Sequence, residues 1–135
     1  MLLCYLNEKA KEEFLMLAVK AAAVNGVIEK AEKDLIDEYC YEVKLPIKYD
    51  DIDLGTSLEE LFDRMRNYEL RSKKIIVFEI ICLLHIDGVF DEDEKNFAYD
   101  LIHHLDLSEE VAQDIFNVAE NYIDVVTRVN ESILV

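Results

Sequence analysis

Residues 87–94 read Asp-Gly-Val-Phe-Asp-Glu-Asp-Glu, and an almost wholly apolar segment, residues 75–84, leads toward them. Gly88 supplies the backbone freedom for a sharp turn, because glycine adopts a positive φ without strain. Asp91 is a residue type that caps helix N-termini, and Glu94, three residues on, completes a capping box. The stretch therefore predicts a helix, an acidic turn and a second helix.

The same pattern occurs earlier in weaker form at residues 25–33, which read Asn-Gly-Val-Ile-Glu-Lys-Ala-Glu-Lys. The two stretches align at an offset of 62 residues, and the alignment carries the turn, the cap and five apolar positions together. We therefore predict one domain over residues 1–135, built from two related units at about 8–68 and 72–130. The long loop at residues 44–56 is then an insertion in the first unit only.

Helix caps and apolar spacing predict an all-α fold of six to seven helices. The fourth helix is apolar on nearly every side, so we expect it to be the central and most buried one. Whether the last helix breaks near Asn121 stays open. The predicted helix starts are Asn7, Glu29, Ser57, Ser72, Asp91 and Ser108. The last helix is expected to bury Val111, Ala112, Ile115, Phe116, Ala119, Tyr122, Ile123 and Val126.

Composition and charge limit the classes of partner. The chain has 30 acidic and 14 basic residues, which gives a formal net charge of −16. Such a surface repels phosphate backbones and anionic membranes, so we expect neither nucleic-acid binding nor membrane insertion. It attracts cations or a basic protein, and we expect a protein partner. The alternative is that the charge serves solubility alone.

The cysteines and the N-terminus indicate a cytoplasmic protein. Cys4, Cys40 and Cys82 are odd in number and far apart, which is typical of reduced thiols, two of them filling the core. The N-terminal residues lack the basic and long apolar regions of a signal peptide. The longest apolar run is interrupted by Glu79 and is shorter than the ~20 residues that span a bilayer.

The acidic turns are candidate metal sites. With Gly88 at the sixth position of a calcium loop, Asp87, Asp91 and Glu94 occupy ligand positions, although the first and third positions hold Leu83 and His85. Three hard carboxylates suit Ca²⁺, Mg²⁺ or Mn²⁺. The weaker candidates are Asn25, Glu29 and Glu32 in the first turn. The alternative is that these residues only cap helices and stabilise the helix dipole.

No catalytic or cofactor-binding set is readable. The chain has no zinc-spaced Cys or His pair and no glycine-rich phosphate loop, so we expect no enzyme and no organic cofactor. Glu79 interrupts the buried helix. We interpret it as part of a narrow solvent-facing stripe. The alternative is a buried carboxylate with a raised pKa, which would favour a hydrolase.

At its two turns the chain resembles the TerB-like family, named from the tellurite-resistance protein TerB. The resemblance covers roughly residues 10–120 and is carried by residues 84–94, with a weaker match at residues 22–32. It implies an all-helical, cytoplasmic accessory protein of prokaryotic stress response, whose acidic turns bind divalent cations. Related domains in J-domain co-chaperones imply an interaction module. Asn25 replaces the expected Asp and weakens the first turn as a metal site.

These observations favour a non-enzymatic, TerB-like accessory or interaction protein. The first alternative is a weak sensor of divalent cations that uses the Asp87-Gly88 turn. The second is a hydrolase that uses buried carboxylates.

Overall fold

The computed structural model describes the whole chain except residues 25, 45–49, 51, 53, 87 and 89. The described residues form six α-helices and one short 3-10 helix, with no strand among them, which confirms the predicted all-α class. The elements are η1 (Leu3–Tyr5), α1 (Glu8–Ala22), α2 (Lys30–Glu42), α3 (Leu58–Met65), α4 (Leu70–Leu84), α5 (Glu92–His104) and α6 (Glu109–Ser132).

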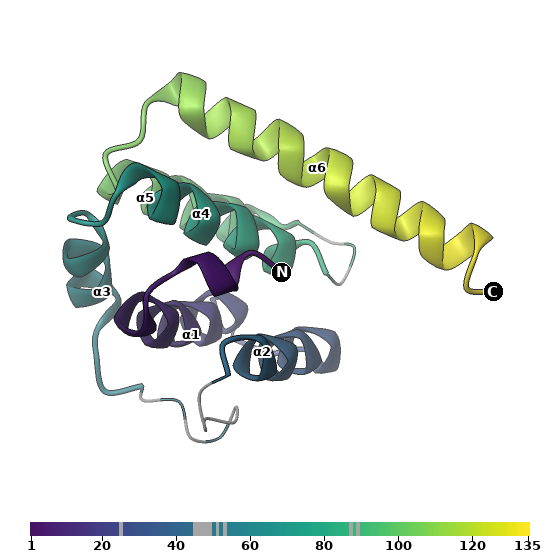
Figure 1. The fold of residues 1–135 in the computed structure, drawn as a ribbon, viewed down its shortest axis with the longest axis horizontal. Helices are drawn as coiled ribbons and strands as arrows, with labels where there is room; N and C mark the ends of the chain where they lie inside the picture. The colour runs from purple at the N-terminus through teal and green to yellow at the C-terminus, as the bar shows by residue number, and fades with distance from the viewer. Residues whose placement is uncertain (25, 45–49, 51, 53, 87, 89) are drawn as a thin grey trace.

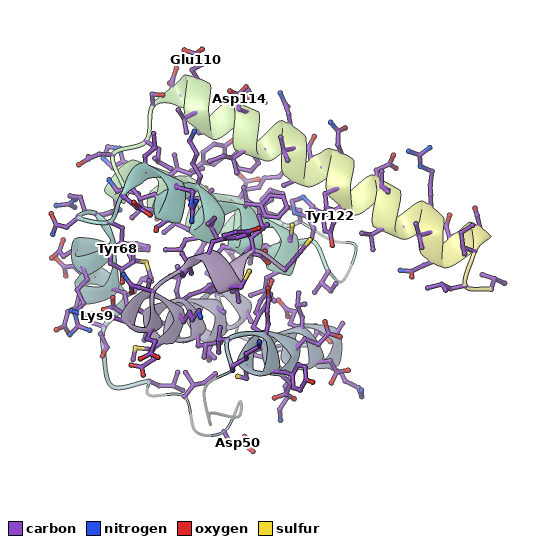
Figure 2. The ribbon with its side chains drawn as sticks, in the orientation of Figure 1. Lys9, Asp50, Tyr68, Glu110, Asp114 and Tyr122 are labelled. Carbon is purple, nitrogen blue, oxygen red and sulfur yellow. The ribbon has the colours of Figure 1, made fainter. Side chains whose placement is uncertain are left out.

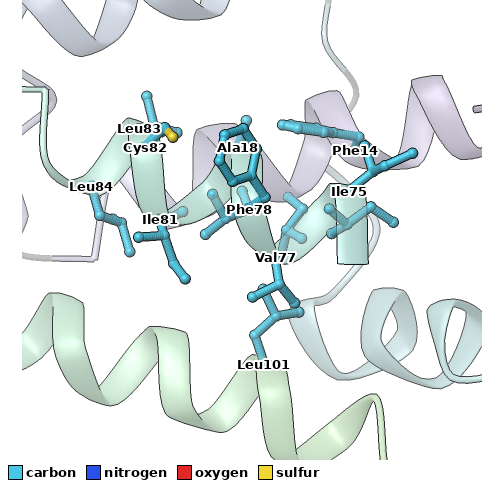
Figure 3. Close-up of a cluster of buried hydrophobic side chains, with 14 of the residues drawn as sticks. Phe14, Ala18, Ile75, Val77, Phe78, Ile81, Cys82, Leu83, Leu84 and Leu101 are labelled. Atoms are coloured by element: carbon cyan, nitrogen blue, oxygen red, sulfur yellow. The ribbon is translucent and has the colours of Figure 1, made fainter. Parts of the chain in front are cut away.

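Helix α4 is the centre of the molecule. It contacts α1, α2, α5, α6 and η1, and every residue from 75 to 84 is buried. Ile80, Ile81 and Leu84 are fully buried, as predicted for the central helix. Figure 3 shows Phe14 and Ala18 of α1 on one side of α4 and Leu101 of α5 on another. A helix that is apolar all round must be enclosed in this way, because any open side would expose apolar surface to water.

Backbone landmarks recur at the offset of 62 residues. Helices α1 and α4 both have 15 residues, and α2 and α5 both have 13. Gly26 and Gly88 adopt φ values of 90° and 81°, in the left-handed region that favours glycine. Lys44 and Asp106, just beyond α2 and α5, also share a positive φ, at 58° and 55°. The two units thus use the same turn before the second helix and the same end after it.

The third helices of the two units differ. Helix α3 has 8 residues and packs against α1 and α5, with the Phe62 and Phe97 rings 6.3 Å apart. Helix α6 has 24 residues, does not break near Asn121, and lies along α4 before running beyond the rest of the molecule (Figure 1). The residues buried in α6 are Ala112, Ile115, Phe116 and Ala119.

The sequence prediction is wrong at the start of α4 and at Val126 of α6. Ser72 does not cap α4: the N-cap is Glu69, whose extended backbone precedes Leu70, and the Ser72 hydroxyl donates to Glu69 Oε1 at 3.4 Å. Val126 is 37% exposed instead of buried, because it borders a cavity instead of packing closely against another helix. The predicted caps Asn7, Ser57 and Ser108 are confirmed, since each side chain accepts from a backbone amide of the first turn.

The central position of α4 predicts the cost of a cavity there. Leu84→Ala is expected to lower the free energy of unfolding by roughly 2–5 kcal/mol, because the surrounding helices cannot close around the deleted side chain. Leu70→Ala, in the first turn of the same helix and 52% exposed, is the matched control and should change stability by less than about 0.5 kcal/mol. Urea unfolding measures both. Equal effects would mean that α4 is not the buried centre.

Candidate functional site

The acidic turn before α5 is a closed capping box. Asp91 Oδ1 accepts from the backbone amide of Glu94 at 2.8 Å, and Glu94 Oε1 accepts from the backbone amide of Asp91 at 3.0 Å. Glu94 is almost fully buried. Asp87, the third predicted ligand, lies outside the described residues. One oxygen of each described carboxylate is therefore committed to the backbone of the helix start.

The turn before α2 repeats this arrangement. Glu29 is the N-cap, and Glu32 Oε1 accepts from the Glu29 backbone amide at 3.0 Å, within a second capping box. Glu32 is buried to the same extent as Glu94, 62 residues later. Asn25, the remaining predicted ligand of this turn, lies outside the described residues. Both turns thus serve at least a structural role, which is worth roughly 1 kcal/mol for each cap.

Metal binding at these turns stays a prediction. Within the described ranges no three His, Cys, Asp or Glu side chains are grouped so that they could hold an ion. The predicted group at the second turn includes Asp87, so the described residues supply only Asp91 and Glu94 of it.

Asp91→Asn separates the metal role from the capping role. Asparagine caps a helix about as well as aspartate, so stability without metal should hold within about 0.5 kcal/mol. Removal of one charged ligand should weaken a cation affinity that we expect to be on the order of 10⁻⁴–10⁻³ M. Calorimetric titration with Ca²⁺, Mg²⁺ and Mn²⁺ makes the measurement. Absence of saturable binding to the unmodified chain at several millimolar would leave these residues as caps alone.

A second candidate site is a cavity of about 330 Å³ between α2, α4 and the distal half of α6. Apolar side chains from all three helices line it, together with the carboxylates of Glu38 and Glu42 on α2 and Glu79 on α4. Figure 2 shows Tyr122 on the side of α6 that faces the rest of the molecule, and its ring lies 5.7 Å from that of Phe78. The lining residues are Met1, Leu35, Glu38, Tyr39, Glu42, Glu79, Cys82, Ile86, Tyr122, Ile123, Val126, Thr127 and Asn130.

Glu79 is buried, so its interpretation as part of a solvent-facing stripe is wrong. Only 2% of it is exposed, because α4 is enclosed on every side and has no stripe open to water. Its Oε1 accepts from the Leu2 backbone amide at 3.0 Å and lies 3.8 Å from the ammonium group of Met1. That ammonium group also forms an ion pair with Glu42. The buried carboxylate is thus held by the N-terminal segment.

Burial raises the pKa values of two α4 side chains on this cavity wall, Glu79 and Cys82. Removal from water raises the pKa of Glu79 above its usual value, and the Leu2 amide opposes part of that effect. Burial also raises the pKa of the Cys82 thiol to about 12, with a further contribution from Glu79. A thiol with that pKa stays protonated at neutral pH and is a poor nucleophile. The Cys82 thiol is therefore unsuited to nucleophilic catalysis at this cavity.

Sequence reasoning missed the carboxylates of α2. Leu35, Glu38, Tyr39 and Glu42 follow the spacing of one helical face, and this mixture of apolar and acidic residues was the available signal. It also missed Glu13 of α1, which is 2% exposed and accepts from Arg64 and Tyr68. Glu13 lies three residues after Ala10 and four before Leu17, on the buried face of its helix.

The predicted cysteine pattern is confirmed in part. Cys40 and Cys82 are buried in the core, and Cys4 is exposed. Over the residues that the structure describes, no helix is long and apolar enough to cross a membrane.

Comparison of the chain with protein-family models, with curated proteins and with solved structures finds no match. The resemblance to the TerB-like family stays a prediction from the two turns and their spacing.

The raised pKa of Glu79 predicts a pH-dependent stability. Between the unfolded pKa, near 4.5, and the raised folded pKa, the native state binds the extra proton, so stability falls as the pH rises through that window. Glu79→Gln keeps an acceptor for the Leu2 amide and removes the charge. In urea unfolding, the stability of the variant relative to that of the unmodified chain should increase as the pH rises above about 4.5. A constant difference would contradict a raised pKa.

Proposed function

We propose that this chain is a non-enzymatic accessory protein, TerB-like in kind, that acts by binding another protein. The observation that carries the proposal is the distal half of α6. Every residue from 124 to the end of this helix is exposed, whereas the first half packs on α4. The exposed stretch includes Val125, Val126 and Val129, and Ile133 at its C-cap is 71% exposed.

An uncovered helical arm of this composition supports a binding role. Valine and threonine are weak helix formers, and a helix end that packs on nothing gains little from burial. Within the arm, the local support is an ion pair between Arg128 and Asp124 at 3.4 Å and a bond from the Thr127 hydroxyl to the Ile123 carbonyl at 2.9 Å. Exposed aliphatic side chains gathered on one element mark interaction surfaces more often than isolated ones do.

The chemistry of the cavity favours binding over catalysis. A hydrolase would need Glu79 to face substrate with a base or acid partner beside it. Instead, its carboxylate meets a backbone amide and an ammonium group, and the nearby Cys82 thiol stays protonated.

The cellular setting that we propose follows the TerB-like similarity: a cytoplasmic accessory protein of the stress response, which includes resistance to tellurite. Three cysteines without a disulfide in the described part of the chain fit a reducing compartment. A weak cation sensor at the Asp91 turn is the alternative, and calorimetric titration of that turn decides it.

Site-specific photo-cross-linking tests the binding role. A benzophenone amino acid placed at Val129, on the arm, should yield one cross-linked protein of defined mass in cells. The same residue at Tyr41, 88% exposed on α2, is the control. The product should decrease several-fold when Val126→Ser is added, because the apolar contact beside it is removed. Equal products at both positions, or none at Val129, would contradict the proposal.

A further inference from the structure

The cavity between α2 and α6 lies where the repeat would bring two helices together. In one half of the molecule, α3 of the first unit meets α5 of the second unit, and the Phe62 and Phe97 rings close that contact. The counterpart pair is α6 of the second unit and α2 of the first. Between them lies the cavity of about 330 Å³, which the exposed arm of α6 lines through Val126, Thr127 and Asn130. Helices α2 and α6 therefore do not pack against each other as α3 and α5 do.

The two sides of the cavity are chemically different. Ile123 and Val126 of α6 and Leu35 of α2 give it apolar surface, and Glu38 and Glu42 of α2 give it a carboxylate edge. None of the described residues that line it is Lys or Arg. The positive charge there is the Met1 ammonium group, which Glu42 binds and which lies 3.8 Å from Glu79. The cavity thus already holds one ammonium group against carboxylates, beside apolar side chains.

We propose that this cavity and the adjoining aliphatic side of α6 bind a basic amphipathic helix of the partner protein. This inference rests on the proposed function and names the class of partner. The apolar side chains of the incoming helix would pack between Leu35, Ile123 and Val126, and its Lys or Arg side chains would face Glu38 and Glu42.

Charge decides between a basic helix and other occupants. A second copy of this chain would bring two molecules of net charge −16 together, and its α6 arm carries Asp124 and Glu131 against Arg128. Phosphate-bearing ligands and anionic membranes meet the same repulsion. A basic helix gains attraction from the carboxylates and covers the aliphatic side chains at the same time.

Two synthetic peptides test the inference on the full chain. The first is an acetylated helical peptide with leucines on one face and lysines on the other, and the second has the same pattern with glutamate in place of lysine. In fluorescence anisotropy at physiological salt, the Leu/Lys peptide should bind saturably with one peptide per chain, and the Leu/Glu peptide should not bind. Equal binding of both peptides would overturn the inference.

Matched variants locate the binding. Glu38→Gln and Val126→Ser alter the cavity, whereas Glu110→Gln and Val118→Ser make the same changes at exposed positions in the first half of α6. Glu38→Gln and Val126→Ser should each weaken the affinity for the Leu/Lys peptide by about threefold or more. Glu110→Gln and Val118→Ser should weaken that affinity by less than about 1.5-fold. Equal weakening by Glu110→Gln would show diffuse attraction to an acidic protein and would overturn the site.

Two further outcomes separate this inference from the proposed function. A dimer in light scattering that Val126→Ser dissociates would assign the surface to a second copy and overturn the basic-helix partner. Cross-linking at Val129 without binding of the Leu/Lys peptide would leave the interaction role standing and overturn the partner class. Absence of a cross-linked product at Val129, together with absence of binding of the Leu/Lys peptide, would overturn both proposals.

Discussion

The burial of α4 is the constraint on which the rest of this structure depends. Ten consecutive residues, 75–84, are buried, and their side chains point to every side of the helix. No single neighbouring helix can shield all of them from water. The two repeat units meet this demand by placing α1 on one side, α6 on another and α5 beside them. Helix α4 thus belongs to the second unit along the chain, but it packs against helices of both units.

The same constraint accounts for the unusual position of Glu79. A carboxylate on a helix that other elements enclose has little contact with water, and an unpaired buried charge is costly. The N-terminal segment meets this cost, because Leu2 donates its backbone amide and the Met1 ammonium group lies nearby. The packing of η1 against α4 follows from the need to satisfy this one side chain as well as from burial of Leu3.

The exposed arm of α6 is a consequence of unequal lengths. Helix α4 has 15 residues and α6 has 24, so α4 can cover only part of its neighbour. The exposed residues of α6, 124–132, extend the helix by roughly 14 Å at a rise of about 1.5 Å per residue. In that overhang Val126 borders the cavity opposite α2, and Val125 and Val129 are exposed.

Local signals in the sequence predicted most of the fold. The caps at Asn7, Ser57, Asp91 and Ser108 are short-range patterns, and the structure has the corresponding helix starts. The turns before α2 and α5 are also short patterns, which recur at an offset of 62 residues. The misplaced start of α4 was also within reach, since Asn7 and Glu69 are separated by that same offset. Ser72 was a stronger capping residue by type, and this preference masked the repeat.

Tertiary features were harder to predict from the sequence. The burial of Glu79 and of Val126 depends on which neighbouring helix covers each side chain and on how far that helix extends. The periodicity of apolar residues within one helix gives no information on either. The cavity joins residues 35–42 to residues 122–130, which are far apart along the chain. The metal prediction rests in part on Asp87 and Asn25, which lie outside the described residues.

Native-state hydrogen exchange tests most directly whether α4 is the enclosed centre and the end of α6 an uncovered arm. Amides of residues 75–84 should exchange only through global unfolding and be the slowest in the chain. Amides of residues 124–132 should exchange faster by at least about a hundredfold, because fraying of the arm breaks no tertiary contact in the core. Protection of residues 124–132 equal to that of α4 would contradict the account.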